Sequence, residues 1–325
     1  MSGTWREFDS HSTDLPREPL DERTRELREL PKTLRPVTGD AVRQRAVFDP
    51  SLKHLRRAYR GSDPVFDDPE RTVAWVRARR AALDAVLLAV SETEWADSLV
   101  LRGSALLAHW FGEQAREPGD LDFVVVPESW RKEDGRTGRM LEGIARTADG
   151  RAGIKASGMV WEDIWTYDRV PGRRMVLPWS APGLPGGQVQ LDFVFNERLP
   201  VGPEPTELAC GAVVLAASPA LSLAWKLLWI ISDGHPQGKD LYDAVLLAER
   251  YPLPRELLHQ VFLQAGEWPL PNRQVQLQDF EALTVEPYYS TEWDHFEAEY
   301  PHLAEPDEKA YARRLVAALR PTFQP

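Results

Sequence analysis

The chain has 325 residues, of which 43% are apolar and 10% aromatic, and its formal net charge at pH 7 is −11. This length and composition suffice for one large domain or two ordinary ones with a hydrophobic core. No run approaches the roughly 18 consecutive apolar residues of a membrane-spanning helix, and the charged N-terminal stretch lacks the apolar segment of a secretory signal. We therefore expect a cytoplasmic protein with no membrane partner.

Cysteine content and charge narrow the functional classes further. The single cysteine, Cys210, excludes an intramolecular disulfide and a Cys-rich zinc site. The acidic balance gives no overall attraction for nucleic acid, so binding of RNA or DNA would need a local basic patch. The basic runs at residues 53–60 and 77–80 could supply one, although solvated helix faces are the favoured interpretation of both.

The N-terminal part of the chain is polar and then becomes helical. Residues 1–45 are predicted to form a loosely ordered arm with one short helix, because the segment is interrupted by several prolines: Pro16, Pro19, Pro31 and Pro36. Residues from 46 to about 93 are predicted to be mainly helical. They end in a long helix at residues 70–90 that has a broad apolar face.

The middle of the chain has the pattern of a sheet. Short strand-like runs at residues 99–102 and 120–126 enclose a helix of about two turns. A helix over residues 129–147 follows, and then an antiparallel meander that ends in the alternating strand 188–195. Residues 46–215 are therefore predicted to be one domain together with its preceding helices.

The remainder, residues 216–325, is predicted to be a helical C-terminal region. Its apolar residues recur with the period of an amphipathic helix in four segments, which are residues 219–234, 239–251, 254–266 and 308–320.

Two aspartates share one face of the strand 120–126. Residues i and i+2 of a strand point to the same side, so Asp120 and Asp122 project together while Leu121 and Phe123 face the opposite way. Adjacent carboxylates repel each other, and a hard cation such as Mg²⁺ removes that repulsion. Two solvated acids at the start of an edge strand remain the alternative interpretation.

A glycine–serine turn and a third acid complete the pattern. Gly103 lets the backbone approach a phosphate closely, and Ser104 begins a helix whose free N–H groups attract anions. Asp192 is the only acid in the strand 188–195. If that strand lies beside 120–126, three carboxylates converge on one face; otherwise Asp192 is a solvent-facing strand residue.

The order of these features resembles a known motif. Gly103–Ser104, a helix and then Asp-Leu-Asp is similar to the G-S/G-x(n)-D-x-D/E motif of the DNA polymerase β-like nucleotidyltransferases. Two later segments, PALSLAWKLLWIISDG and GKDLYDAVLLAER, resemble the Lys-containing helix and the K/R-D-x-x-D helix of the AbiEii/AbiGii-type toxin nucleotidyltransferases. The resemblance covers residues from about 99 to 250. Pro118 replaces the usual serine, and the gap from Ser104 to Asp120 is longer than usual, which implies a different phosphate-side loop.

The resemblance implies an α+β fold in which a polymerase β-like domain with a mixed sheet precedes the helical C-terminal region. It also implies two Mg²⁺ or Mn²⁺ ions held by Asp120, Asp122 and Asp192, and an NTP whose phosphates contact Gly103 and Ser104. Lys226 shares a helix face with large apolar residues, where an ammonium needs an anionic partner. By the resemblance Lys226 and Asp240 are catalytic, Lys226 and Lys239 bind nucleotide, and Asp243 is a buried partner of a lysine.

Three functional hypotheses remain open from the sequence. A toxin-like enzyme would transfer a nucleotide to tRNA or another RNA and would have a cognate antitoxin as partner. An acidic chain would repel such a polyanion, which favours a small molecule or a protein side chain as acceptor. A catalytically silent NTP-binding module is the third.

Overall fold

A computed structural model describes residues 4–8, 14–39, 41–166, 170–266, 273–285, 291, 293–304 and 307–324. The chain divides into two compact units. The first unit contains Met1–Ala105, Pro118–Glu197 and Pro205–Leu215. The second contains Leu106–Glu117, Arg198–Glu204 and Ala216–Pro325.

The sheet that dominates the first unit has seven strands in the order β10-β11-β5-β6-β9-β8-β7. Strands β6 and β9 are parallel, whereas β5–β6, β7–β8 and β8–β9 are antiparallel. This arrangement confirms the predicted α+β class with a mixed sheet. The strands are β5 (Leu99–Arg102), β6 (Asp120–Val125), β7 (Val160–Thr166), β8 (Val170–Trp179), β9 (Gly187–Val194), β10 (Glu204–Glu207) and β11 (Val213–Ala216).

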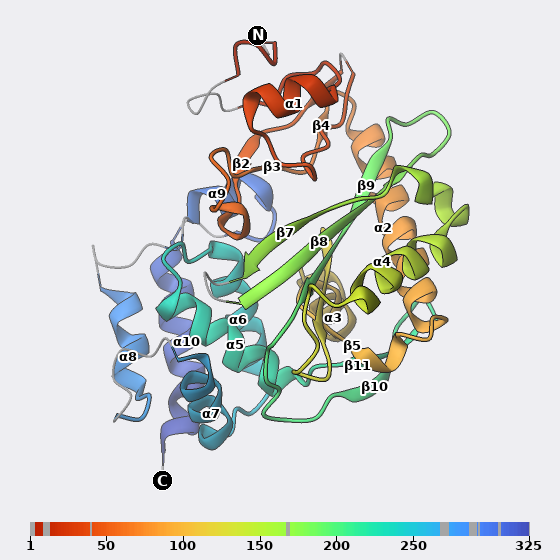
Figure 1. Cartoon of the computed structure of the whole chain (residues 1–325). Helices are drawn as coiled ribbons and strands as arrows, with labels where there is room; N and C mark the ends of the chain where they lie inside the picture. The colour runs from red at the N-terminus through yellow and green to blue at the C-terminus, as the bar shows by residue number, and fades with distance from the viewer. Residues whose placement is uncertain are drawn as a thin grey trace. The chain divides into compact units, whose positions relative to one another are not determined.

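Two helices, α2 (Pro69–Ser91) and α4 (Gly135–Ala148), lie together on one face of this sheet (Figure 1). The rings of Trp75 in α2 and Trp179 in β8 lie 5.4 Å apart, which marks the helix-covered face. Because strand residues alternate, Trp179 shares that face with Met175, and Arg174 lies on the other. The helix predicted at 70–90 is present, and the one predicted at 129–147 begins later, at Gly135.

The segment between the arm and α2 differs from its prediction. Residues 46–68 were expected to be mainly helical, and the structure instead contains very short strands and one 3-10 turn. Strands of two or three residues are too short to show an alternating pattern, so their sequence carries little signal. The elements are β2 (Ala46–Phe48), η1 (Pro50–Leu52), β3 (Tyr59–Gly61) and β4 (Val65–Phe66), and β4 pairs with β1 (Val42–Arg43) at the end of the arm.

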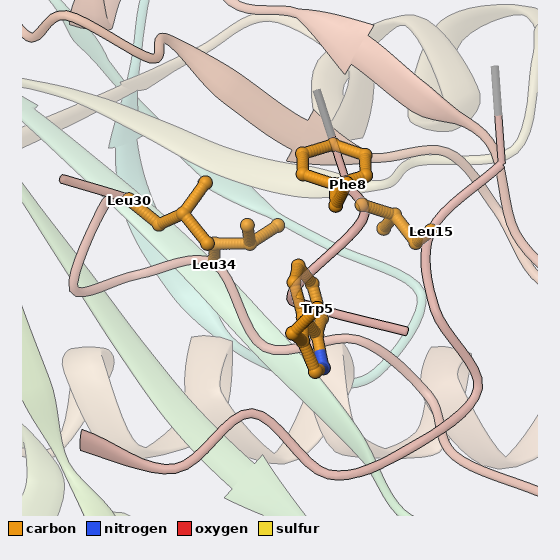
Figure 2. Close-up of a cluster of buried hydrophobic side chains, with 5 residues drawn as sticks. All are labelled: Trp5, Phe8, Leu15, Leu30 and Leu34. Atoms are coloured by element: carbon orange, nitrogen blue, oxygen red, sulfur yellow. The ribbon is translucent and has the colours of Figure 1, made fainter. Parts of the chain in front are cut away.

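The N-terminal arm, expected to be loosely ordered, has a small hydrophobic cluster in its described part. The predicted short helix is α1 (Glu22–Arg28). Figure 2 shows the five buried side chains of the cluster, which are Trp5, Phe8, Leu15, Leu30 and Leu34. Widely spaced apolar residues between prolines have no helical or strand period, and the cluster therefore escaped a prediction based on periodicity.

Helices form most of the second unit. Helix α6 contacts α5, α9 and α10, and α10 also contacts α8. Four of these helices match the predicted segments, whereas α8 and α9 were not predicted. Among the described residues, no helix has both the length and the apolar character needed to cross a membrane. The helices are α5 (Pro219–Ser232), α6 (Gly238–Arg250), α7 (Arg255–Ala265), α8 (Leu277–Glu281), α9 (Trp293–Glu299) and α10 (Glu308–Phe323).

Candidate active site

The turn between β5 and helix α3 (Ser104–Phe111) contacts both aspartates of β6. Gly103 has a φ of 79°, in the left-handed region that favours glycine. A Cβ atom at this position would collide with Oδ2 of Asp122. The Ser104 hydroxyl donates a hydrogen bond of 3.4 Å to Oδ1 of Asp120. The turn and the two acids therefore form one local structure.

The parallel pairing of β6 with β9 brings the third aspartate to the same place. Asp122 is the register partner of Asp192, and Asp120 is the partner of Gln190. Neighbouring strands lie about 4.8 Å apart, and partners in register point to the same side of the sheet. Asp120, Asp122 and Asp192 thus share the face that α2 and α4 leave uncovered.

An arginine that sequence reasoning missed binds the third acid. Arg174, in β8, is the register partner of Asp192 and is almost completely buried. Its Nε and Nη2 atoms donate hydrogen bonds of 2.8 Å to the two Asp192 oxygens. Its Nη1 donates to Asp49, and Nη2 also donates to the Ser51 hydroxyl at 3.0 Å. One guanidinium therefore links the sheet to the segment around η1.

Burial and shared charge shift the ionisation of these groups in opposite directions. Burial raises the pKa of Asp192, Arg174 offsets only part of that effect, and Asp120 and Asp49 raise this pKa further. For Asp49 the same burial is outweighed by Arg174, which holds the pKa of that carboxyl below its ordinary value. Burial alone would lower the pKa of Arg174, but Asp192 and Asp49 raise it well above its usual range. The guanidinium therefore stays charged but is shared between two acids.

The same register continues into a row of charged side chains across five strands. Arg102 in β5 is the register partner of Asp122, and its side chain donates a 2.8 Å hydrogen bond to Glu197. At the other end Glu162, the partner of Arg174, accepts hydrogen bonds from the hydroxyl and the backbone N–H of Thr33. A signal for this row existed in the sequence, since charged residues are rare in strands this apolar.

The donor set on this face fits a hard divalent cation, because the three aspartates offer only carboxylate oxygens. In the part of the chain that the structure describes, however, no three His, Cys, Asp or Glu side chains are placed to hold a metal ion. Arg174 engages both oxygens of Asp192, and Oδ2 of Asp122 points at Gly103. Metal binding therefore needs different side-chain rotamers on the backbone seen here.

The other predicted site residues form a buried charge cluster in the second unit. The Lys226 Nζ lies 2.7 Å from Oδ1 of Asp240 and 2.9 Å from Oδ2 of Asp243, and Arg116 is 3.1 Å from the latter oxygen. Burial alone would lower the pKa of Lys226, but the two aspartates outweigh it and raise this pKa. The ammonium is thus charged and held in one orientation. Lys239, next to Asp240, is half-buried.

Comparisons with known proteins give one family match. The sequence model of the family described as "Nucleotidyl transferase AbiEii toxin, Type IV TA system" matches residues 85–321. A comparison with curated proteins gives no match. Among solved structures, JHP933 from Helicobacter pylori is similar over 76% of this chain and 91% of its own, with 16% sequence identity and a TM-score of 0.42.

Proposed function

Since the chain belongs to the AbiEii family of nucleotidyl transferase toxins of Type IV toxin–antitoxin systems, we propose that it transfers a nucleotide from an NTP to an RNA acceptor with the help of divalent metal ions. The match extends from the long helix before the sheet to the last helix of the chain. The family membership supports nucleotidyl transfer as the reaction type and a cognate antitoxin as a partner.

One observation carries the proposal for the site. The β6–β9 register puts Asp122 beside Asp192, and the Gly103–Ser104 turn contacts Asp120 and Asp122 on the same sheet face. The first N–H groups of a helix have no partner within the helix. A turn that leads into a helix next to clustered carboxylates therefore offers separate places for phosphates and for cations. A silent module that kept only the fold would not need both features on one face.

Different groups of the chain would bind the phosphates, hold the cations and orient the acceptor. The N–H groups at the start of α3 would donate hydrogen bonds to the β- and γ-phosphates of the NTP. The Ser104 hydroxyl would turn its single O–H from Asp120 to a phosphate oxygen. Asp120, Asp122 and Asp192 hold the cations, and Asp192 accepts or orients the proton of the attacking hydroxyl. Bound Mg²⁺ or Mn²⁺ would supply activation of that hydroxyl and neutralise charge on the leaving pyrophosphate.

The cluster in the second unit is proposed to act on the nucleotide as well. An ammonium carries three N–H donors, and the Lys226 Nζ lies within ion-pair distance of Asp240 and Asp243. Held in this way, Lys226 is a pre-oriented countercharge for a triphosphate, with Asp240 fixing its position and Lys239 as an additional cation. Pre-orientation reduces the conformational entropy that phosphate binding would otherwise cost.

The acceptor class is tested by following the label. Purified protein is incubated with each α-³²P-labelled NTP, Mg²⁺, total RNA, a protein extract and a small-molecule extract, and the three fractions are then separated. We expect label in RNA of tRNA size. Label confined to the protein or small-molecule fraction would reject the RNA acceptor but keep nucleotidyl transfer, and NTP binding without transfer to any fraction would favour the silent module.

A further inference from the structure

A cavity of about 440 Å³ lies in the first unit beside strands β7, β8 and β9. Its volume falls in the range of small-molecule sites. Residues of the strands and of the N-terminal arm line it together, and they include both apolar and polar side chains. The lining includes Arg35, Pro36, Val160, Val176, Pro178 and Gln188.

One lining residue has a polar atom without a partner in the part of the chain that the structure describes. The side-chain oxygen Oε1 of Gln188 is buried and accepts no hydrogen bond from the described part of the chain. Leaving a buried acceptor unpaired is unfavourable, and such groups in native proteins are nearly always satisfied. A ligand in the cavity with an N–H donor would satisfy this oxygen if the Gln188 amide turned toward it.

A cation of the arm completes the lining. Arg35 is exposed, and among the described residues it has no ion-pair partner, unlike Arg79, Arg102 and Arg174. Val160, Val176 and Pro178 also line the cavity and offer an apolar surface for a flat ring. A donor edge, a flat ring and an anionic group are together the chemistry of a nucleotide.

The cavity opens on the same sheet face as the three aspartates. Gln188, Gln190 and Asp192 alternate along β9 and therefore share a side. Gln190 is the register partner of Asp120, and Gln188 lies two residues, or about 7 Å, before it along the strand. A nucleotide in the cavity would therefore lie next to the site proposed for phosphoryl chemistry.

We propose that this cavity is a nucleotide-binding subsite in which Gln188 accepts a hydrogen bond from the base edge and Arg35 binds a phosphate. The subsite deepens the proposed nucleotidyl transfer and rests on it for its role. The ligand is either the NTP or the terminal nucleotide of the acceptor, because both carry the same groups. Its binding itself needs no turnover.

The test varies the groups of the ligand and the side chains of the protein in parallel. Dissociation constants are measured by titration calorimetry for AMP, CMP, cytidine and ribose 5-phosphate, with wild type, Gln188→Leu and Arg35→Gln. Arg23→Gln is the matched control, because Arg23 is also an exposed arginine of the arm and does not line the cavity. Thermal midpoints check that each variant is folded.

Each variant should remove one part of the ligand's affinity. We expect Gln188→Leu to weaken AMP or CMP and cytidine about tenfold while leaving ribose 5-phosphate unchanged. Arg35→Gln should weaken AMP or CMP and ribose 5-phosphate about tenfold and leave cytidine unchanged. The proposal is overturned if the wild type binds neither AMP nor CMP. It is also overturned if Gln188→Leu and Arg35→Gln have the same dissociation constants as the wild type and the Arg23→Gln control.

The source of the nucleotide follows from the transfer reaction. If Gln188→Leu raises KM for the NTP, the cavity holds the NTP; if it raises KM for the acceptor, the cavity holds the acceptor's end. If Gln188→Leu transfers nucleotide with both KM values unchanged, the proposed subsite is wrong, while the proposed nucleotidyl transfer still holds. Gln188-dependent binding of CMP without any transfer would support the subsite and reject the proposed reaction.

Discussion

Arg174 is the residue on which most of the buried charge of the proposed site depends. It binds both oxygens of Asp192 and also reaches Asp49, and all three side chains are at least nine-tenths buried. A buried carboxylate is tolerated only when it is paired, since its desolvation is otherwise uncompensated. Loss of this one guanidinium leaves two such carboxylates beside Asp120.

Arg174→Gln should therefore destabilise the fold strongly. We expect the free energy of unfolding in urea to fall by about 3–5 kcal/mol, the usual cost of breaking a buried ion pair. Arg173→Gln is the matched control on the same strand, where Arg173 pairs with Asp163, a carboxylate that is 41% exposed. That variant should lose at most about 1 kcal/mol. Equal losses in both variants would show that Arg174 does not compensate the buried acids.

At this scale the sequence predicted the acids but not their partner. Strand alternation alone put Asp120 and Asp122 on one side, and the single acid in the strand 188–195 marked Asp192. The pairing of Arg174 with Asp192 depends on which strands are neighbours and in which register, and alternation within one strand contains no such information. Asp49 was out of reach for the same reason, because its contact spans 125 residues of sequence.

Among the elements, the turn from β5 into α3 makes the strictest demand on its sequence. Gly103 combines a positive φ with a carboxylate where a side chain would be. Gly112, just after the other end of the helix, also has a positive φ, of 56°, but a Cβ there would meet no atom within 4 Å. An alanine at Gly112 would therefore introduce backbone strain alone, whereas an alanine at Gly103 would introduce both strain and a collision with Asp122.

Gly103→Ala should reduce nucleotidyl transfer about 100-fold or more, because the added methyl group displaces Asp122 from its position. Gly112→Ala should cost only the backbone strain, about 1 kcal/mol of stability, and keep its activity. Both are measured as initial transfer rates alongside a thermal melt. A Gly103→Ala protein as active as the Gly112→Ala protein would argue against a role of this turn in phosphate and metal binding.

The elements also show why some of the fold could be predicted and some could not. The segment that became α5 has an apolar period sustained over 14 residues and a Ser218 N-cap, so its prediction was secure. Strands β1 and β4 have two residues each and depend on tertiary pairing. Helix α9 has seven residues, too few for its period to stand out.

For the whole molecule, the part before the family match contributes to the proposed site. The match begins at residue 85, yet Asp49 binds Arg174, Thr33 binds Glu162, and Arg35 lines the cavity. All three belong to the first unit together with the sheet. The N-terminal segment is therefore part of the face on which the chemistry is proposed, and a chain that begins at the match would lack it.

The net charge of −11 also acts at this scale. A polyanionic acceptor would be repelled at long range, so its binding would have to come from local contacts such as the one proposed for Arg35 with a phosphate. Mg²⁺ at the aspartates would further reduce the repulsion. Both effects are consistent with an acceptor recognised at its end and not along its length.

The most direct measurement is the Mg²⁺-dependent transfer of label from an NTP by the wild type and by Asp122→Asn and Asp192→Asn. The control is Asp163→Asn, because Asp163 lies in β7 and points to the opposite face of the sheet. Chelation of Mg²⁺ should abolish transfer by the wild type. The Asp122 and Asp192 variants should each lose at least about 100-fold, while the Asp163 variant remains active. Transfer that survives chelation, or that is unchanged in Asp122→Asn, would contradict a catalytic metal site built from these acids.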